Sequence, residues 1–327
     1  MKFLVVIFGL ILLYWPRLFA VVQQDRWFSR WQAWVGNLAI GARAPVLDLV
    51  ITLAVPVLAV WWLLAGLEGE FFGLPYFFIN ILVLVYAFGR GDSREQVEEL
   101  LEALRRGDMQ AAFHDLAFFT AGGDGTVDGD ETADRDGTVD GDGTVNSDET
   151  VNGGETVDDQ DRLEHPDAFV EELKARLAYS YFERHLAVVF WFLVAGAPLA
   201  LLYRLSVLYQ QRVRSGERPQ LPASRWLWLM EWLPLRIVGF TLALVGHFQT
   251  ALGTWRELLL SGWSSQRVLL AVVNAAMSPA RVDAGGAATD SPDDGETIGQ
   301  VVKEVEGLFY SAIVCWLILI SVVLILA

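Results

Sequence analysis

Four stretches of 18 or more residues without a charged side chain run through this chain, at Leu49–Leu67, Phe71–Gly89, Leu186–Tyr203 and Gly307–Ala327. A helix of about 20 apolar residues crosses the hydrocarbon core of a bilayer. A backbone in hydrocarbon has no water to bond, so it must satisfy its own N–H and C=O groups as helix. The sequence therefore predicts an all-α, multi-pass transmembrane protein.

Two weaker apolar runs accompany these four. The first, Phe3–Trp15, is followed by Pro16 and Arg17 instead of a small-residue cleavage site, which favours an uncleaved anchor over a signal peptide. The second, Trp226–Trp255, is amphiphilic at its start and uncharged from Ile237 onward. It either spans the membrane, or it lies along the membrane interface at its start and enters the membrane farther on.

The net charge of −16 is concentrated in one segment. Residues 123–161 hold 11 Asp, 3 Glu and one Arg, a net −13, so the rest of the chain carries about −3. Such a local imbalance does not indicate an acidic or nucleic-acid partner for the whole protein. We predict no nucleic-acid binding, and the lipid bilayer is the first expected partner.

Within this segment lie six tandem hexapeptides at residues 123–158: GDGTVD, GDETAD, RDGTVD, GDGTVN, SDETVN and GGETVD. Starting from Asp140, the calcium-loop pattern fails, because its position 5 is Thr144 and its position 12 is Val151. One small apolar residue in six is too little to bury against dense like charge. We predict a disordered linker, and weak cation binding or an ordered solenoid remain the alternatives.

The distribution of basic residues predicts an orientation. Lys and Arg near span ends favour the cytosol. The connection around Glu68 contains no Lys or Arg. The segment that follows the first apolar run holds Arg26, Arg30 and Arg43. The segment after Gly89 holds Arg90, Arg94, Arg105 and Arg106. These counts predict an outside N-terminus and a cytosolic middle region.

The run Leu186–Tyr203 strains this rule, because a single crossing would place the arginines between Arg204 and Arg225 outside. Gly196-Ala197-Pro198 lies near its centre, and proline interrupts helical hydrogen bonding. We favour a re-entrant or strongly kinked segment; the alternative is that another span is misassigned.

The polar middle region contains helical patterns. Apolar residues at i, i+3, i+4 and i+7 from Val97 predict the first helix of a hairpin. After the insert, Pro166 suits a first helical turn, and Glu172 and Arg176 form an i, i+4 pair.

These features divide the chain into seven parts. They are a membrane region with three helices (1–90), a cytosolic helical hairpin (91–122), the acidic insert (123–161), an amphipathic helix (162–185), membrane, re-entrant and interfacial helices (186–255), an amphipathic segment with a polar loop (256–306) and a C-terminal transmembrane helix (307–327).

No catalytic motif of strength is present. The chain has no phosphate-binding glycine loop, no dinucleotide fingerprint and a single cysteine, Cys315, inside an apolar run. Its four histidines are scattered, without i+3 or i+4 partners. We therefore predict no metal site and no cofactor.

Four ionisable residues stand out as candidate ligand- or partner-binding groups. Glu183 immediately precedes the glycine–proline run, and His247 lies in an apolar stretch, where polar groups are costly and often functional. Glu231 and Arg236 bracket Trp232-Leu-Pro234 and are expected to pair structurally. Asp48 is interpreted as a first-turn carboxylate favoured by the helix dipole.

The segment Met230–His247, with its Trp-Leu-Pro-Leu-Arg element, resembles the AmpE family of inner-membrane proteins. Three further segments carry the resemblance: Tyr181–Arg204, Phe28–Trp34 and Leu104–Met109. It implies a multi-pass protein of the bacterial inner membrane, encoded beside the cytosolic amidase AmpD. The implied role is a non-enzymatic sensor or modulator that links cell-wall recycling to β-lactamase induction, with a cell-wall-recycling ligand or a regulatory protein as partner.

The AmpE family is in turn similar to the CbiB and CobD enzymes of cobalamin synthesis, which form an amide using ATP. Tyr203 and Arg204 match a Tyr-Lys/Arg pair of those enzymes, and this adds Arg204 to the candidate residues. Two polar positions that follow, Asn and Asp in the enzymes, hold Val207 and Gln210 here. That departure disfavours the enzymatic alternative, a membrane-bound amide synthase that would bind a nucleotide or activated carboxylate. A purely structural scaffold is the third possibility.

Overall fold

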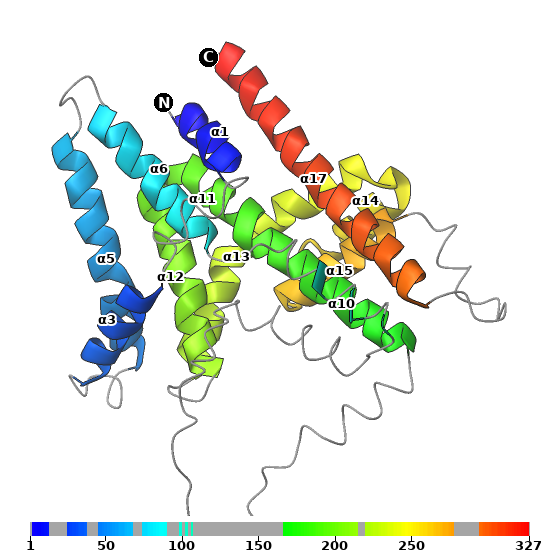
Figure 1. The fold of residues 1–327 in the computed structure, drawn as a ribbon, viewed down its shortest axis with the longest axis horizontal. Coiled ribbons are helices and arrows are strands. Elements are labelled where there is room, and N and C mark those ends of the chain that lie inside the picture. The colour runs from blue at the N-terminus through cyan, green and yellow to red at the C-terminus, as the bar shows by residue number, and fades with distance from the viewer. Residues whose placement is uncertain are drawn as a thin grey trace, which may run out of the picture.

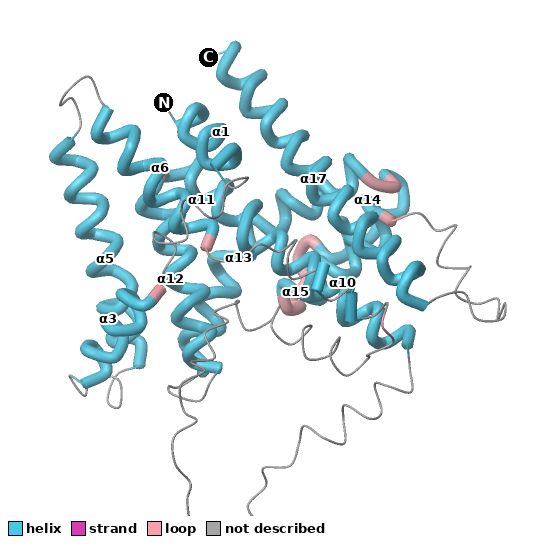
Figure 2. The backbone as a smooth tube through the Cα atoms, viewed as in Figure 1, coloured by secondary structure: helices cyan, strands magenta, loops and turns pink. Residues whose placement is uncertain are grey.

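The computed structural model describes residues 2–12, 25–37, 45–67, 74–89, 98–99, 102–103, 106, 166–214, 220–277 and 294–326. Within these ranges every regular element is helical and no strand occurs (Figure 2), which confirms the all-α prediction. The acidic insert, most of the predicted hairpin at 91–122 and most of the polar loop at 282–299 lie outside the described residues.

Three helices of the described part are long and apolar enough to cross a bilayer. They are α5 (Pro45–Leu67), α13 (Gln220–Val245) through its stretch Pro222–Val245, and α17 (Asp294–Leu326) through Ile298–Val322. The shorter apolar helix α6 spans Leu74–Phe88. The prediction of a membrane protein is thereby confirmed, and the helix at the amphiphilic run Trp226–Trp255 proves to be of spanning length.

The run Leu186–Tyr203 is not one helix. Helix α11 (Ala187–Ala195) ends at Gly196, whose φ of 82° is accessible mainly to glycine, and α12 (Ala197–Arg214) begins at the next residue. Pro198 lies in the first turn of α12, where its missing N–H leaves no intrahelical bond unmade. Helices α11 and α12 pack on each other (Figure 1), and the chain turns back between them at Gly196.

The far end of α12 lies beside α3 (Arg26–Asn37). The guanidinium of Arg212 donates to the carbonyl oxygen of Ser29 at 2.8 Å and to Oε1 of Gln32 at 3.1 Å. Figure 1 shows α3 at the end of the molecule opposite both chain termini. The hairpin therefore brings Arg212 to the side of Arg26 and Arg30, as the positive-inside pattern requires.

A proline inside α5 is accommodated by a tryptophan from a neighbouring helix. Pro56 has no N–H, so the carbonyl of Thr52, four residues earlier, lacks its helical donor. The indole N–H of Trp31 on α3 donates to that oxygen at 3.1 Å. A backbone acceptor that has no water available is thus satisfied across two helices.

The same device recurs in α13. Pro234 leaves the carbonyl of Met230 without its helical donor. The indole N–H of Trp191 on α11 donates to that oxygen at 3.2 Å. Both prolines within spanning helices are therefore anchored to a second helix through a tryptophan.

The remaining helices pack around this frame. Helix α1 (Lys2–Leu12) contacts α6 and α11, and α14 (Phe248–Leu258) folds back from α13 onto α15 (Ser265–Ala276). Helix α10 (Pro166–Tyr181) begins at its proline, as predicted, and packs on α15 and α17. Large side chains from several of these helices form one buried core, among them Phe28, Leu84, Phe182, Tyr203 and Phe309.

Candidate functional site

A polar cavity of about 400 Å³ lies where α10 and its continuation meet α12, α13 and the start of α15. Most of its lining side chains carry hydrogen-bonding groups. The residues used below are Tyr179, Ser180, Glu183, Arg184, Gln210 and Glu231. We refer to it as the α10–α13 cavity, and its wall is built by segments far apart in the sequence.

Glu231 is the carboxylate of α13 in this wall, and it is only 3% exposed. The hydroxyl of Tyr179 on α10 donates to its Oε1 at 2.6 Å, which is within the range of short O–H···O hydrogen bonds. The hydroxyl of Tyr203 on α12 lies 3.5 Å from the same oxygen, a distance at which the bond is weak. Glu231 therefore ties three helices together at the cavity.

A single π-helical turn, η2 (Phe182–Leu186), joins α10 to α11. A π-turn contains one residue more than an α-turn, and such turns occur often at functional sites. Both Glu183 and Arg184 line the α10–α13 cavity. The ring of His185 lies instead against Phe88 and Tyr181, with ring centroids 6.0 Å apart in each case.

Two buried polar groups of the cavity have no hydrogen-bond partner among the described residues. They are Oγ of Ser180 and Oε1 of Gln210, on side chains that are 5% and 8% exposed. Leaving such a group unpaired costs about 1–3 kcal/mol. Both residues line the cavity, but these two atoms are shielded from it, so a molecule in the cavity would bond them only after their side chains turn toward it.

Arg204, although predicted as a candidate, lies outside the cavity wall. Its Nη2 is 2.8 Å from Oδ2 of Asp25, in an ion pair that joins α12 to the start of α3. Its guanidinium packs against Gly89, which has a φ of 76°. A Cβ at position 89 would come within 2.7 Å of the Arg204 Cζ. Arg204 thus holds helices together.

Arg236 and His247 are placed away from the cavity as well. Nε of Arg236 donates to the carbonyl of Leu259 at 2.6 Å, and its Nη2 donates to that of Ser261 at 3.1 Å. These carbonyls follow α14, so the cation caps that helix end instead of pairing with Glu231. His247 is exposed at the break between α13 and α14, where its backbone N–H donates to the carbonyl of Ala276.

Of the five candidates, the fold brings Glu183 and Glu231 to one cavity and separates the other three from it. A binding role for each remains a prediction. Sequence reasoning missed Tyr179 and Ser180, which belong to no recognisable motif, and it considered Gln210 only as a departure from the amide-synthase pattern. The one available signal was the i, i+4 spacing of Tyr179 and Glu183 on a helix.

Two ion pairs lie along α10. Nε of Arg176 lies 2.6 Å from Oε1 of Glu172, which confirms the predicted i, i+4 pair. Glu171 accepts from Lys174 and from the amide of Asn274 on α15, each at 2.8 Å. Burial raises the pKa of Glu171, but these two donors outweigh it and hold that pKa below its usual value.

Comparison with known proteins gives one family. The sequence model of the family described as "Regulatory signalling modulator protein AmpE" matches residues 4–121 and 150–290. The Cobalamin biosynthesis protein CobD of Stutzerimonas stutzeri (strain A1501) is 42% identical over 74 residues, which are 21% of this chain and 24% of that protein. Protein AmpE of Shigella flexneri is 30% identical over 94 residues, 27% of this chain and 33% of that protein. The matched stretches thus span a quarter to a third of these curated relatives, and no solved structure matches the chain.

Proposed function

Because the chain belongs to the AmpE family of regulatory signalling modulators, we propose that it is a multi-pass protein of the bacterial inner membrane that senses a ligand of cell-wall recycling and modulates β-lactamase induction. The α10–α13 cavity is the proposed ligand site. We propose that ligand binding is signalled through a change in the position of α10, because this helix links the cavity wall to the polar region that precedes it in the chain.

One observation carries this proposal. Ser180 Oγ and Gln210 Oε1 are buried in the cavity wall and unpartnered among the described residues. They lie on α10 and α12, so a ligand that bonds both groups favours one relative position of the two helices. Differential binding of this kind is what a sensor needs to shift between two states.

The composition of the wall favours binding without catalysis. Val207 and Gln210 both line the cavity, and they occupy the positions that resemble the Asn and Asp of the cobalamin amide synthases. At position 210, the neutral amide of Gln210 stands where the amide synthases have an Asp carboxylate. A negative charge that could bind the metal ion of a metal–phosphate complex is therefore missing there. Val207 and Gln210 would then contribute to binding a ligand, without contributing to a reaction.

The test is β-lactamase induction in a strain with an inducible enzyme. Deleting the gene should change the level of induction, and wild-type protein should restore it. Gln210→Leu should fail to restore it at equal membrane abundance, because the substitution keeps the side chain's size and removes its hydrogen-bonding groups. Gln249→Leu, at an exposed position of α14, is the matched control and should restore induction. Unchanged induction in the deletion strain would remove the sensor role.

An ATP-dependent amide synthase is the second candidate. The 42% identity to the cobalamin biosynthesis protein over 74 residues favours it, together with Tyr203 and Arg204. Thermal unfolding of the purified protein with and without ATP and Mg²⁺ separates the two functions. A nucleotide-dependent rise in the unfolding midpoint supports the synthase, and its absence counts against it.

A further inference from the structure

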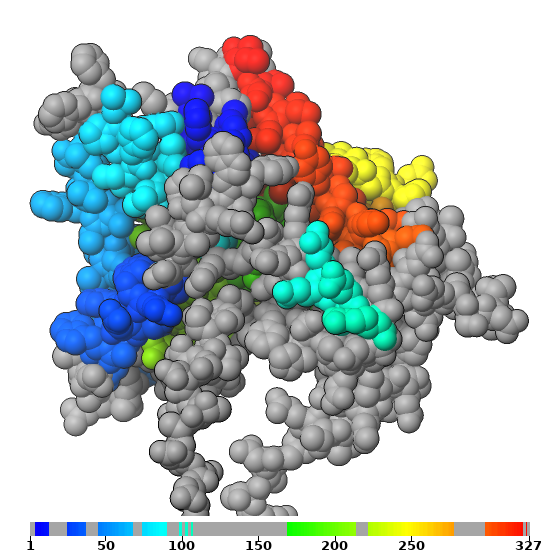
Figure 3. Space-filling model, in the orientation of Figure 1, coloured from blue at the N-terminus to red at the C-terminus, as the bar shows by residue number. Residues whose placement is uncertain are grey.

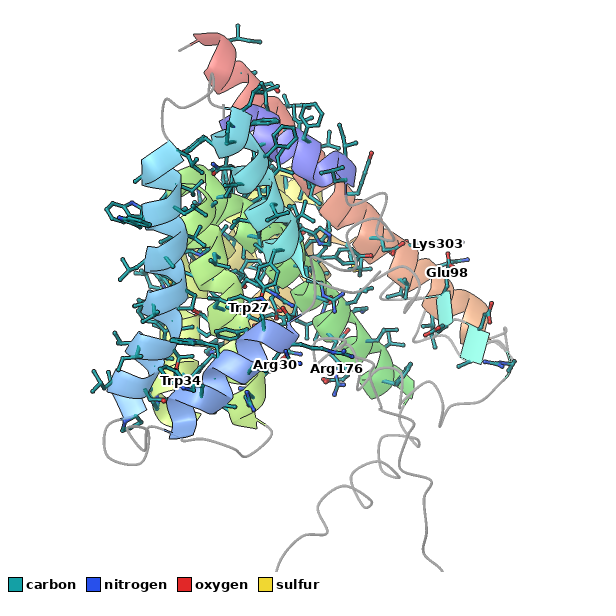
Figure 4. The ribbon with its side chains drawn as sticks, turned by 60° about the vertical axis from the view of Figure 1, so that its left-hand side comes forward. Trp27, Arg30, Trp34, Glu98, Arg176 and Lys303 are labelled. Carbon is teal, nitrogen blue, oxygen red and sulfur yellow. The ribbon has the colours of Figure 1, made fainter. Side chains whose placement is uncertain are left out.

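The outward face of α3 carries two exposed tryptophans and an exposed arginine. Trp27, Arg30 and Trp34 follow the i, i+3, i+7 spacing of one helix face, and Figure 4 shows them along α3 beside the lower part of α5. Trp27 is 45% and Trp34 is 55% exposed. Arg30 makes no ion pair or hydrogen bond with the described residues.

The opposite face of α3 is fixed to the rest of the protein. Phe28, Gln32 and Val35 are buried, and the helix is held at its start by the Asp25–Arg204 ion pair and further along by Arg212. The helix therefore cannot rotate to bury its exposed face. Trp27, Arg30 and Trp34 must contact the lipid or water that surrounds the protein.

A groove of about 460 Å³ runs between this face and α5. Trp27, Arg30 and Trp31 form one wall, and α5 forms the other through Val55, Pro56 and Ala59. Figure 3 shows α3 and α5 side by side at the surface. Helix α5 has the length and composition of a membrane span, so its apolar side of the groove faces lipid.

The groove crosses from the hydrocarbon to the headgroup level. The uncharged run of α5 begins at Leu49, and Val55 lies six residues farther on, about 9 Å deeper at 1.5 Å per residue. Arg30 must stay at the interface because a lone cation is costly in hydrocarbon. Tryptophans beside it are typical of that boundary.

We propose that an anionic phospholipid binds in this groove, with its phosphate at Arg30 and one acyl chain along Val55, Pro56 and Ala59. The guanidinium supplies charge and paired donors to the phosphate oxygens. Trp27 and Trp31 line the groove beside Arg30. The Trp31–Thr52 hydrogen bond fixes the Trp31 side of the groove to α5.

The experiment is native mass spectrometry of the full-length protein released from neutral-detergent micelles that contain phosphatidylglycerol and phosphatidylcholine of the same acyl chains in equal amounts. The wild type should retain phosphatidylglycerol in preference. Arg30→Gln should weaken phosphatidylglycerol retention roughly five-fold, the effect of removing one cation near an anionic lipid surface. Arg256→Gln, at an exposed position of α14 outside the groove, is the matched control and should leave retention unchanged.

A second pair of variants tests the acyl-chain part. Ala59→Phe fills the groove from an exposed position and should reduce retention of both lipids, whereas Leu58→Phe, exposed but outside the groove lining, should not. Equal retention of both lipids by the wild type would overturn the proposal. So would an Arg30→Gln protein that keeps the full preference, or loss of preference in both arginine variants alike.

Discussion

The indole N–H of Trp31 donates to the carbonyl oxygen of Thr52 at 3.1 Å, and Thr52 is the residue whose helical donor is missing because position 56 is proline. This bond links α3 directly to a spanning helix. It explains how a proline is retained in α5 although Thr52 is buried and water cannot reach the freed carbonyl.

Replacing Trp31 by Phe should lower the free energy of unfolding by about 1–3 kcal/mol, because the Thr52 carbonyl is then buried without a donor. In a Pro56→Ala background the loss should be smaller, since the introduced alanine supplies the helical N–H that proline lacks. Denaturant unfolding of the four proteins in detergent gives this double-mutant cycle. Strict additivity would contradict the assignment, and Trp34→Phe, at an exposed position, is the control.

The pair formed by Trp191 and Met230 predicts a second, independent cycle. Trp191→Phe should destabilise the wild type by about 1–3 kcal/mol and the Pro234→Ala protein by less. Trp191 lies on the hairpin helix α11, so its loss should also expose the hairpin to proteolysis. Equal destabilisation in both backgrounds would show that the indole contributes through packing alone.

Gly89→Ala should destabilise the protein by about 1–3 kcal/mol, because position 89 has a positive φ and a Cβ there would clash with the Arg204 guanidinium. Gly253→Ala on α14 is the contrasting substitution. No atom lies within 4 Å of a Cβ at that position, so alanine should be neutral or stabilise the helix by up to about 1 kcal/mol. Thermal unfolding midpoints compare the two variants, and an equal effect of both would be the contrary result.

Stability should depend on pH through Glu171. Its folded-state pKa is lowered, so its contribution is present above the unfolded-state pKa and is lost as the pH falls through the folded-state value. Glu171→Gln should therefore lower the unfolding midpoint at neutral pH, with the difference shrinking below about pH 4. The exposed Glu257→Gln serves as control. A difference that stays constant with pH would refute the linkage.

The contact of Arg212 with α3 predicts that Arg30 and Arg225 lie on one side of the membrane. With Cys315 replaced by serine, single cysteines at positions 30 and 225 should react with a membrane-impermeant thiol reagent from the same side. A cysteine at position 68 should react from the other side. Labelling of positions 30 and 225 from opposite sides would show that α11 and α12 cross the membrane as one span.

Local sequence signals were sufficient for single helices. Pro166 opens α10, and Glu172 pairs with Arg176, because capping and i, i+4 contacts depend only on neighbours along the chain. In the uncharged run Leu186–Tyr203, the glycine and proline near its centre predicted a re-entrant or kinked segment. The fold places the break at Gly196, where α11 ends and α12 begins.

The candidate site was only partly predictable for the same reason. Glu183 was selected because it precedes the glycine–proline run, and Glu231 because it brackets Trp232-Leu-Pro234 with Arg236; the fold places both in the wall of one cavity. Nothing in the spacing of Arg204 or Arg236 shows that Asp25 and the carbonyls after α14 are their partners. Those partners lie up to 179 residues away along the chain.

The sequence by itself determined that this protein is helical and immersed in lipid, because hydrocarbon forces each backbone segment to satisfy its own hydrogen bonds and that demand is met locally. Only the tertiary structure decided which polar groups meet. Tyr179 reaches Glu231, Trp31 reaches Thr52, and Arg212 returns to α3. Each of these contacts depends on how helices cross, and helix crossing is set by packing between distant segments, which no local pattern records.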